Sequence, residues 1–291
     1  TMTVINTNIN ALQASNASNR AAAMTSQAMT RLSTGLRINS AADDAAGLAI
    51  STSMTSQING MNQSIKNAND GISLAQTAEG SLTEVTNMLQ RVRELAVQSS
   101  SGTYSSSDRD QMQAEVTSLT NQISNVLSTT TFNGVGLFST TSSTPVTFVI
   151  QAGANNSSAD RVTISSTGFD GGQLVNTLTS GGLGLQVNDT TGSAGTGVAN
   201  ARTTMANVDS LLANVATVNA NFGAGQSQLQ SAVNNMTNTV TNLSAARSRI
   251  QDTDYSAEST AMAKAQILAQ ASTAMIAQAN QSQQNVLSLL K

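Results

Sequence analysis

The chain has 291 residues, a formal net charge of −3, and charged residues at only 10% of its positions. It contains no Cys and no His, so thiolate nucleophiles, imidazole bases and the commonest transition-metal ligands are all missing from the sequence. The low charge also leaves no basic patch that could release counterions from a nucleic acid backbone. These features argue against an enzyme, a metal or cofactor site, and a nucleic-acid-binding protein.

Aromatic residues are scarce, with two Tyr, five Phe and no Trp. A core built mainly from smaller side chains is thin, and helices lying side by side suit it because small residues let them approach closely. The composition therefore favours a helical rod over a compact globule.

The first 19 residues carry no charged side chain, and Val4, Ile5, Ile9 and Leu12 begin a helical apolar pattern. No basic region followed by an apolar core stands at the start, so we expect no cleaved secretory signal peptide.

Residues 265–290 are also uncharged, but their many amide side chains make a membrane span a poor interpretation. The apolar stripe of this segment consists of Ile267, Leu268, Ala271, Met275, Ile276 and Ala279. The two terminal helices are expected to pair with each other, with copies of themselves, or with both. Each helix alone buries too little apolar area to offset its ordering entropy, so disorder is expected before a partner binds.

The middle of the chain contains three apolar patterns that alternate steps of three and four residues. Their members are Met54, Ile58, Met61, Ile65, Ala68, Ile72 and Ala75, continued by Leu82, Leu89, Val92 and Leu95; then Met112, Val116, Leu119, Ile123 and Val126; then Leu229, Val233, Met236, Val240, Leu243 and Ile250. These patterns predict long amphipathic helices that pack as a bundle, with an antiparallel connection at residues 99–107.

Two β-branched stretches, residues 145–150 and 161–164, predict one β-hairpin. Residues 167–199 are rich in Gly, Ser and Thr and predict a surface excursion before a long helix resumes near Ala201. The expected fold is mainly α: an elongated, coiled-coil-like rod of antiparallel long helices with one β-hairpin.

Paired acidic residues are the remaining candidates for chemistry: Asp43 with Asp44, Asp108 with Asp110, and Asp252 with Asp254. Their neighbours are Ala, Ser and Thr at expected helix starts, so helix capping explains them better than acid/base or metal chemistry. Ser40 and Asp43 have the spacing of a capping box, which predicts that a helix restarts at Ser40.

Several longer motifs resemble bacterial flagellins. Residues 4–8 read Val-Ile-Asn-Thr-Asn, residues 31–41 read Arg-Leu-Ser-Thr-Gly-Leu-Arg-Ile-Asn-Ser-Ala, residues 89–98 read Leu-Gln-Arg-Val-Arg-Glu-Leu-Ala-Val-Gln, residues 132–134 read Phe-Asn-Gly, and residues 245–250 read Ala-Ala-Arg-Ser-Arg-Ile. The resemblance covers residues 1–166 and 201–291 and leaves little room for large variable outer domains.

The resemblance implies a non-enzymatic subunit that polymerises into the flagellar filament outside the cell. It assigns residues 1–42 and 254–291 to an inner helical domain that becomes ordered on polymerisation, and residues 43–253 to an outer core domain. The implied partners are copies of the chain, the type III export apparatus, an export chaperone on the C-terminal segment, and the filament cap and hook-junction proteins.

The resemblance also implies site residues. The expected assembly contacts are Ile5, Ile9, Leu12, Ile267, Leu268, Met275, Ile276, Val286, Leu287 and Leu290. By position, Arg91, Leu95 and Glu115 match the family residues credited with contact to a Toll-like flagellin receptor of a host. Packing between subunits is the competing role for Arg91 and Leu95.

The nearest alternative is the hook–filament junction protein, which shares the terminal assembly helices but caps a structure instead of extending it. A secreted coiled-coil translocator or signalling rod would carry charged residues beside its seams, and this chain is poor in charge.

Overall fold

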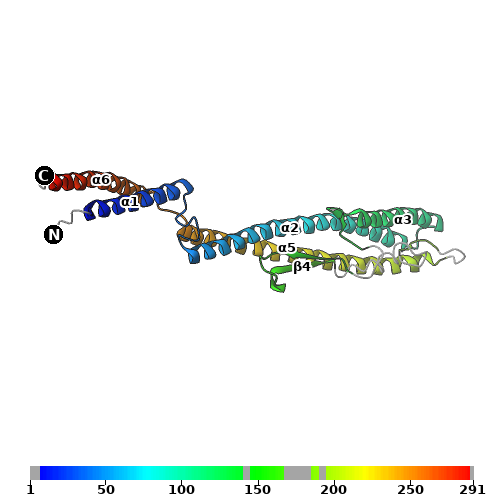
Figure 1. Ribbon diagram of the computed structural model, residues 1–291. Helices are drawn as coiled ribbons and strands as arrows, with labels where there is room; N and C mark the ends of the chain where they lie inside the picture. Colours follow the sequence, from blue (N-terminus) through cyan, green and yellow to red (C-terminus); the bar gives the residue numbers. More distant parts are fainter. Residues whose placement is uncertain (1–6, 140–144, 167–184, 190–194, 289–291) are drawn as a thin grey trace. The chain divides into compact units, whose positions relative to one another are not determined.

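The structure is a computed structural model that describes residues 7–139, 145–166, 185–189 and 195–288 (Figure 1). Its elements in chain order are α1 (Ile9–Thr34), α2 (Ala45–Ser99), α3 (Ser106–Thr129), β1 (Thr131–Phe132), β2 (Val135–Gly136), β3 (Thr147–Gln151), η1 (Ser158–Asp160), β4 (Arg161–Ser165), α5 (Gly197–Gln251) and α6 (Tyr255–Ser288). These elements confirm the expected mainly α fold with long helices and a β-hairpin.

Contacts divide the chain into two compact units. We call residues 1–58 with 241–291 the terminal unit, and residues 59–240 the central unit. The expected inner and outer domains, with boundaries after residues 42 and 253, concern positions in a polymer and stay a prediction.

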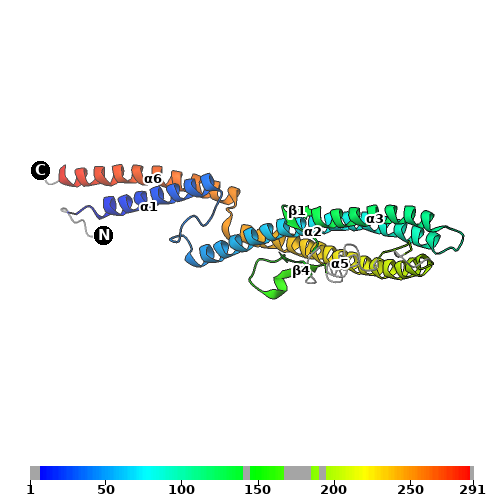
Figure 2. The same ribbon diagram turned by 90° about the vertical axis from the view of Figure 1, so that its right-hand side faces the viewer.

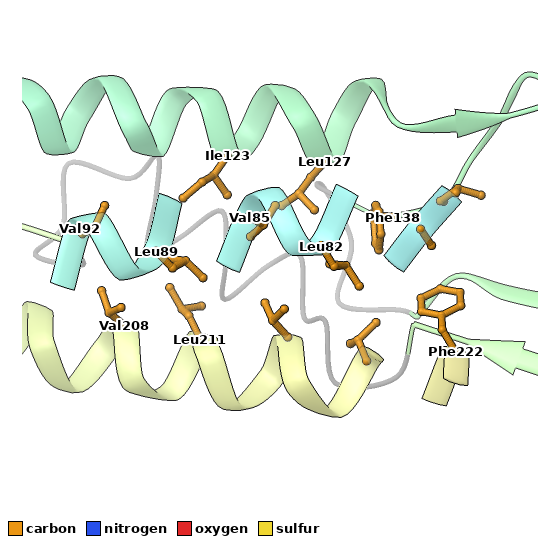
Figure 3. Close-up of a cluster of buried hydrophobic side chains, with 14 of the residues drawn as sticks. Leu82, Val85, Leu89, Val92, Ile123, Leu127, Phe138, Val208, Leu211 and Phe222 are labelled. Carbon is orange, nitrogen blue, oxygen red and sulfur yellow. The ribbon is translucent and has the colours of Figure 1, made fainter. Parts of the chain in front are cut away.

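The core of the central unit lies between α2, α3 and α5. Figure 3 shows four side chains of α2 between the other two helices: Leu82, Val85, Leu89 and Val92. All four are fully buried and follow steps of three, four and three residues, as the heptad pattern predicts. The part of α2 in this unit is roughly 60 Å long at 1.5 Å per residue, so the core is narrow and extended.

The β3–β4 hairpin packs directly on the helices of the central unit. Its antiparallel register pairs Thr147 with Ser165, close to the predicted strand ends. Two glycines allow the close approach: a Cβ on Gly71 would lie 3.0 Å from Ile150 Cγ1, and a Cβ on Gly225 would lie 2.7 Å from Ile164 Cγ1. The hairpin therefore packs against the helices at these two glycines, where the absence of a Cβ leaves room for its side chains.

A second, shorter hairpin, β1–β2, was not predicted. Asn133 and Gly134 form its turn with φ values of 50° and 79°. This is the left-handed conformation that two-residue hairpin turns require, and Asn-Gly is the pair that adopts it most readily. The chain then enters the core, where the rings of Phe138 and Phe222 pack edge to face with centroids 6.4 Å apart.

The expected surface excursion at residues 167–199 is partly wrong. Within that range, Leu185 is 6% exposed and Val187 is fully buried, so the chain returns to the core there. Residues 167–184 and 190–194 lie outside the described residues. Leu185 and Val187 are two apolar residues among Gly, Gln and Asn, too few for a periodic signal, so the sequence did not reveal this return.

Side chains of the helices hold the returning segment by its backbone. The Gln113 side chain donates to the carbonyl of Leu185 at 3.3 Å and accepts from the N–H of Val187 at 2.7 Å. Thr204 donates to the carbonyl of Gln186 at 2.7 Å. These bonds satisfy backbone groups that have no helix or sheet partner, which permits their burial.

Aspartates cap helix starts, as the sequence predicted, but helix α2 begins later than expected. Asp43 accepts from the backbone of Ser40 in a turn, and this hydrogen bond lowers the pKa of its carboxyl. Helix α2 begins only at Ala45, where Asp44 accepts from the N–H of Gly47 at 2.9 Å. The expected restart at Ser40 was therefore wrong, because the Ser40–Asp43 pair closes a turn before the helix.

The starts of α3 and α6 follow the same chemistry. Ser105 and Asp108 form a reciprocal capping box at the start of α3, and the hydrogen bonds from Ser105 lower the pKa of the Asp108 carboxyl. Asp254 accepts from the backbone of Ser256 and Ala257 at the start of α6. Capping is thus confirmed for Asp44, Asp108 and Asp254, whereas Asp110 accepts from the side chain of Asn188 and Asp252 from that of Ser248.

In the terminal unit, α1 and α6 lie side by side (Figures 1 and 2). Helix α1 ends at Gly35, whose φ of 70° is the left-handed conformation typical of a helix C-terminus. The chain after α1 then pairs with the chain before α6, because Leu36 and Asp252 form an antiparallel bridge. This bridge places the start of α6 next to the end of α1.

Candidate assembly surface

The contact between α1 and α6 is built from small side chains. The residues buried in it recur at intervals of seven: Ala21 and Ala28 on α1, and Ala265, Ser272 and Ala279 on α6. Small side chains allow the helices to approach closely, but each buries little apolar surface. The pair is therefore close-packed and weakly stabilised.

Polar contacts hold the pair at its two ends. At one end, the Asn8 side chain donates to the carbonyl of Ala279 at 3.1 Å. At the other, Arg31 and Glu258 form an ion pair at 3.6 Å, and both side chains are largely buried. These contacts fix the register of α1 against α6.

Several large apolar side chains of the two helices point away from this seam, whereas Leu32, Met262 and Ile276 are half-buried. The exposed fractions are 49% for Ile9, 60% for Leu12, 66% for Ile267, 42% for Leu268 and 62% for Met275. Exposed apolar residues are common singly, but several on two adjacent helices form a surface suited to a partner.

The other predicted assembly residues are placed differently. Ile276 is half-buried beside the seam, so it stabilises the α1–α6 pair itself. Val286 and Leu287 lie in the last turns of α6, and their side chains are outside the described part of the chain. Ile5 and Leu290 lie outside the described residues.

The stripe predicted on α6 therefore divides between two faces. Ala279 and Ile276 turn toward α1, whereas Ile267, Leu268 and Met275 turn outward. Ser272 is also buried in the seam, and the apolar pattern did not predict it. Its seven-residue spacing from Ala265 and Ala279 was the available signal.

Three grooves run along the α1–α6 pair. Their volumes are about 780, 400 and 470 Å³. Met29 and Gln266 line the first, Met275 and Leu268 line the second, and Leu268 and Met24 line the third. Each groove thus combines apolar side chains with amides and hydroxyls, and could accept side chains of a similar helix.

The residues matched to a receptor contact lie in the central unit. The Arg91 guanidinium donates to Glu115 at 2.8 Å and to Glu94 at 3.1 Å, and the bond to Glu115 raises the pKa of Arg91. Leu95, by contrast, is only 2% exposed and belongs to the core between the helices. The Arg91 and Glu115 side chains are therefore about half exposed, whereas Leu95 is buried.

Within the described residues, no helix combines the length and the hydropathy needed to cross a membrane. The same part of the chain holds no cluster of acidic residues arranged to bind a metal ion.

Two family models match the chain. Residues 5–143 match the bacterial flagellin N-terminal helical region, and residues 205–290 match the bacterial flagellin C-terminal helical region.

Similar proteins cover almost the whole chain. Flagellin of Bacillus subtilis is 40% identical over 302 aligned residues, covering 99% of each chain. The flagellar filament 33 kDa core protein of Treponema phagedenis is 38% identical over 291 residues, covering 99% of this chain and 100% of the relative. The structure of a putative flagellar hook-associated protein from Vibrio parahaemolyticus covers 72% of this chain and 100% of its own, with a TM-score of 0.56 and 14% identity, which shows a shared fold alone. The chain therefore belongs to the bacterial flagellins and is a structural subunit of the flagellar filament, not an enzyme.

Proposed function

We propose that this flagellin polymerises through the outward faces of α1 and α6. The observation that carries the proposal is the division of side chains between α1 and α6, where small residues are buried in the seam and Ile9, Leu12, Ile267, Leu268 and Met275 are exposed. Ile9, Leu12, Ile267, Leu268 and Met275 would make the contacts between copies. Ile5, Val286, Leu287 and Leu290 are expected to extend them.

Burial of these side chains supplies the driving force. Fully burying one large aliphatic side chain contributes about 1.5–3 kcal/mol. Residues 9–19 and 265–288 carry no charged side chain, so packing on these segments desolvates no charge of their own, although Arg20 lines the third groove. Since the α1–α6 seam alone is thin, we expect residues 1–42 and 254–291 to become fully ordered only as the inner domain of the polymer, with 43–253 outside it.

Export in an unfolded state completes this proposal. A subunit without cysteine needs no oxidising folding step, and the seam of small side chains between α1 and α6 opens at low cost. We therefore expect the type III flagellar apparatus to carry the chain out of the cell, a chaperone to cover its C-terminal segment beforehand, and the cap and hook-junction proteins to receive it outside.

Contact with a host receptor of the Toll-like class is a further expectation. The exposed ion pair between Arg91 and Glu115 offers both charges to such a partner. Leu95 would act indirectly, by holding the helix surface in place.

Seeded polymerisation tests the central claim. Purified subunit is mixed with short filament seeds, and growth is followed by electron microscopy. The full chain should extend the seeds, whereas versions lacking residues 1–42 or 254–291 should not. Ile267→Ser should slow growth strongly because it removes one outward apolar contact, while Ala277→Ser on an exposed position of the same helix should change it little.

Two results would count against this function. Binding of the full chain only at seed tips would favour a junction protein. Equal growth of the Ile267→Ser and Ala277→Ser variants would show that the outward apolar face does not drive assembly.

A further inference from the structure

The methionines of this chain are unevenly distributed between core and surface. Among those whose side chains are described, the exposed ones are Met24 at 45%, Met29 at 56% and Met275 at 62%. All three lie on α1 or α6. In the central unit, Met112 and Met236 are only 8% and 7% exposed.

Each exposed methionine lines a different groove of the α1–α6 pair. Met29 lines the groove of about 780 Å³, Met275 the groove of about 400 Å³ and Met24 the groove of about 470 Å³. Methionine is unbranched and polarisable, so it fills irregular gaps at a contact between chains. The three thioethers therefore stand where a second copy would pack, under the function proposed above.

The same sulfur atoms are open to oxidants. In the reaction with hydrogen peroxide, a sulfur lone pair attacks one peroxide oxygen, an S–O bond forms and the O–O bond breaks. The departing hydroxide takes up the remaining proton and leaves as water, so sulfur is oxidised by two electrons and the peroxide is reduced. The product, methionine sulfoxide, is polar and chiral.

Oxidation at these positions leaves the subunit's own seam intact. The seam consists of Ala21, Ala28, Ala265, Ser272 and Ala279, none of which reacts with peroxide. A sulfoxide pressed into a groove, however, must lose its water, and a contact built for thioethers leaves it short of hydrogen-bond partners.

We propose that Met24, Met29 and Met275 are modification sites through which a peroxide-class oxidant stops free subunits from polymerising. The inference rests on the proposed polymerisation through α1 and α6. It also predicts that the free subunit is sensitive to oxidation, whereas packing in the filament covers the same sulfur atoms and protects them from the oxidant.

The test begins with free subunit treated with hydrogen peroxide. Mass spectrometry of peptides should show sulfoxide at Met24, Met29 and Met275 well before Met112 and Met236. The concentration of subunit needed to extend seeds should then rise about tenfold or more. A rise of this size is what the weakening of one apolar contact between copies would cause. Treatment with methionine sulfoxide reductases should restore growth, since it regenerates the original chain.

Variants identify the responsible sites. A subunit with Met24, Met29 and Met275 all changed to Leu should keep its growth after peroxide treatment. The matched control, with Met112→Leu and Met236→Leu, should remain sensitive. If the first variant folds or assembles poorly, the reductase rescue still decides the question on the unchanged chain.

Each failure has its own meaning. Untreated subunit that does not extend seeds overturns the proposed assembly, and this inference with it. Untreated subunit that grows, together with oxidised subunit that grows equally well, overturns this inference alone. Equal loss of growth in the triple Leu variant would assign the effect to other sites.

Discussion

At the scale of single residues, two helix glycines test how closely the β3–β4 hairpin packs on the helices, because one of them is crowded by the hairpin and the other faces open space. A Cβ on Gly225 would lie 2.7 Å from Ile164 Cγ1, whereas a Cβ on Gly80 would meet nothing within 4 Å. Gly225→Ala should destabilise the central unit by about 1–3 kcal/mol, because Ile164 is buried in β4 and the hairpin must shift. Gly80→Ala should stabilise it by about 0.5–1 kcal/mol, because alanine costs less backbone entropy in a helix. Urea unfolding of both variants measures the two signs, and a stabilised Gly225→Ala protein would show that the hairpin is not fixed against α5.

At the scale of elements, the close approach of α1 and α6 depends on side-chain size at the seam. Ala265 is fully buried there, and a leucine at this position would force the helices apart. Ala265→Leu should lower the temperature at which filaments dissociate, whereas Ala265→Ser, which keeps the side chain small, should lower it much less. The measurement is the loss of sedimentable filament on heating. Equal behaviour of the two variants would contradict a size-limited seam.

Sequence patterns predicted the central helices well because one dominant apolar period marks each of them. Leu82, Leu89 and Val92 have the expected spacing and are fully buried. Helix α6 carries two apolar periods, one of small and one of large residues, so the pattern could not show which face meets α1. Which face meets α1 depends on how closely the two helices approach. Hydropathy alone would bury Ile267 and expose Ser272, but in the structure Ser272 is buried and Ile267 is exposed.

Other features escaped prediction for different physical reasons. The β1–β2 hairpin has only two residues per strand, too few for a period, although the Asn133-Gly134 turn was a usable signal. Burial of Val187 depends on the hydrogen bond that its N–H donates to the side chain of Gln113, which lies far away in the sequence. Leu95 matched a family contact by position, but its burial follows from the packing of three helices around it. Contacts between residues so far apart in the sequence form only when the chain folds, so a local sequence pattern cannot predict them.

At the scale of the whole molecule, the two units differ in what stabilises them. The central unit buries large side chains such as Leu89 and Phe222, whereas the terminal unit buries mainly alanine between α1 and α6. In the free subunit, amide hydrogens of α1 and α6 should therefore exchange with solvent at least roughly a hundredfold faster than those at the centre of α2. In filaments the same terminal amides should become protected, because packing between copies adds the apolar burial that the seam lacks. Hydrogen exchange followed by mass spectrometry of both forms measures this difference. Protection of α1 and α6 in the free subunit equal to that of α2 would show that the terminal pair is stable by itself, and ordering on polymerisation would then be ruled out.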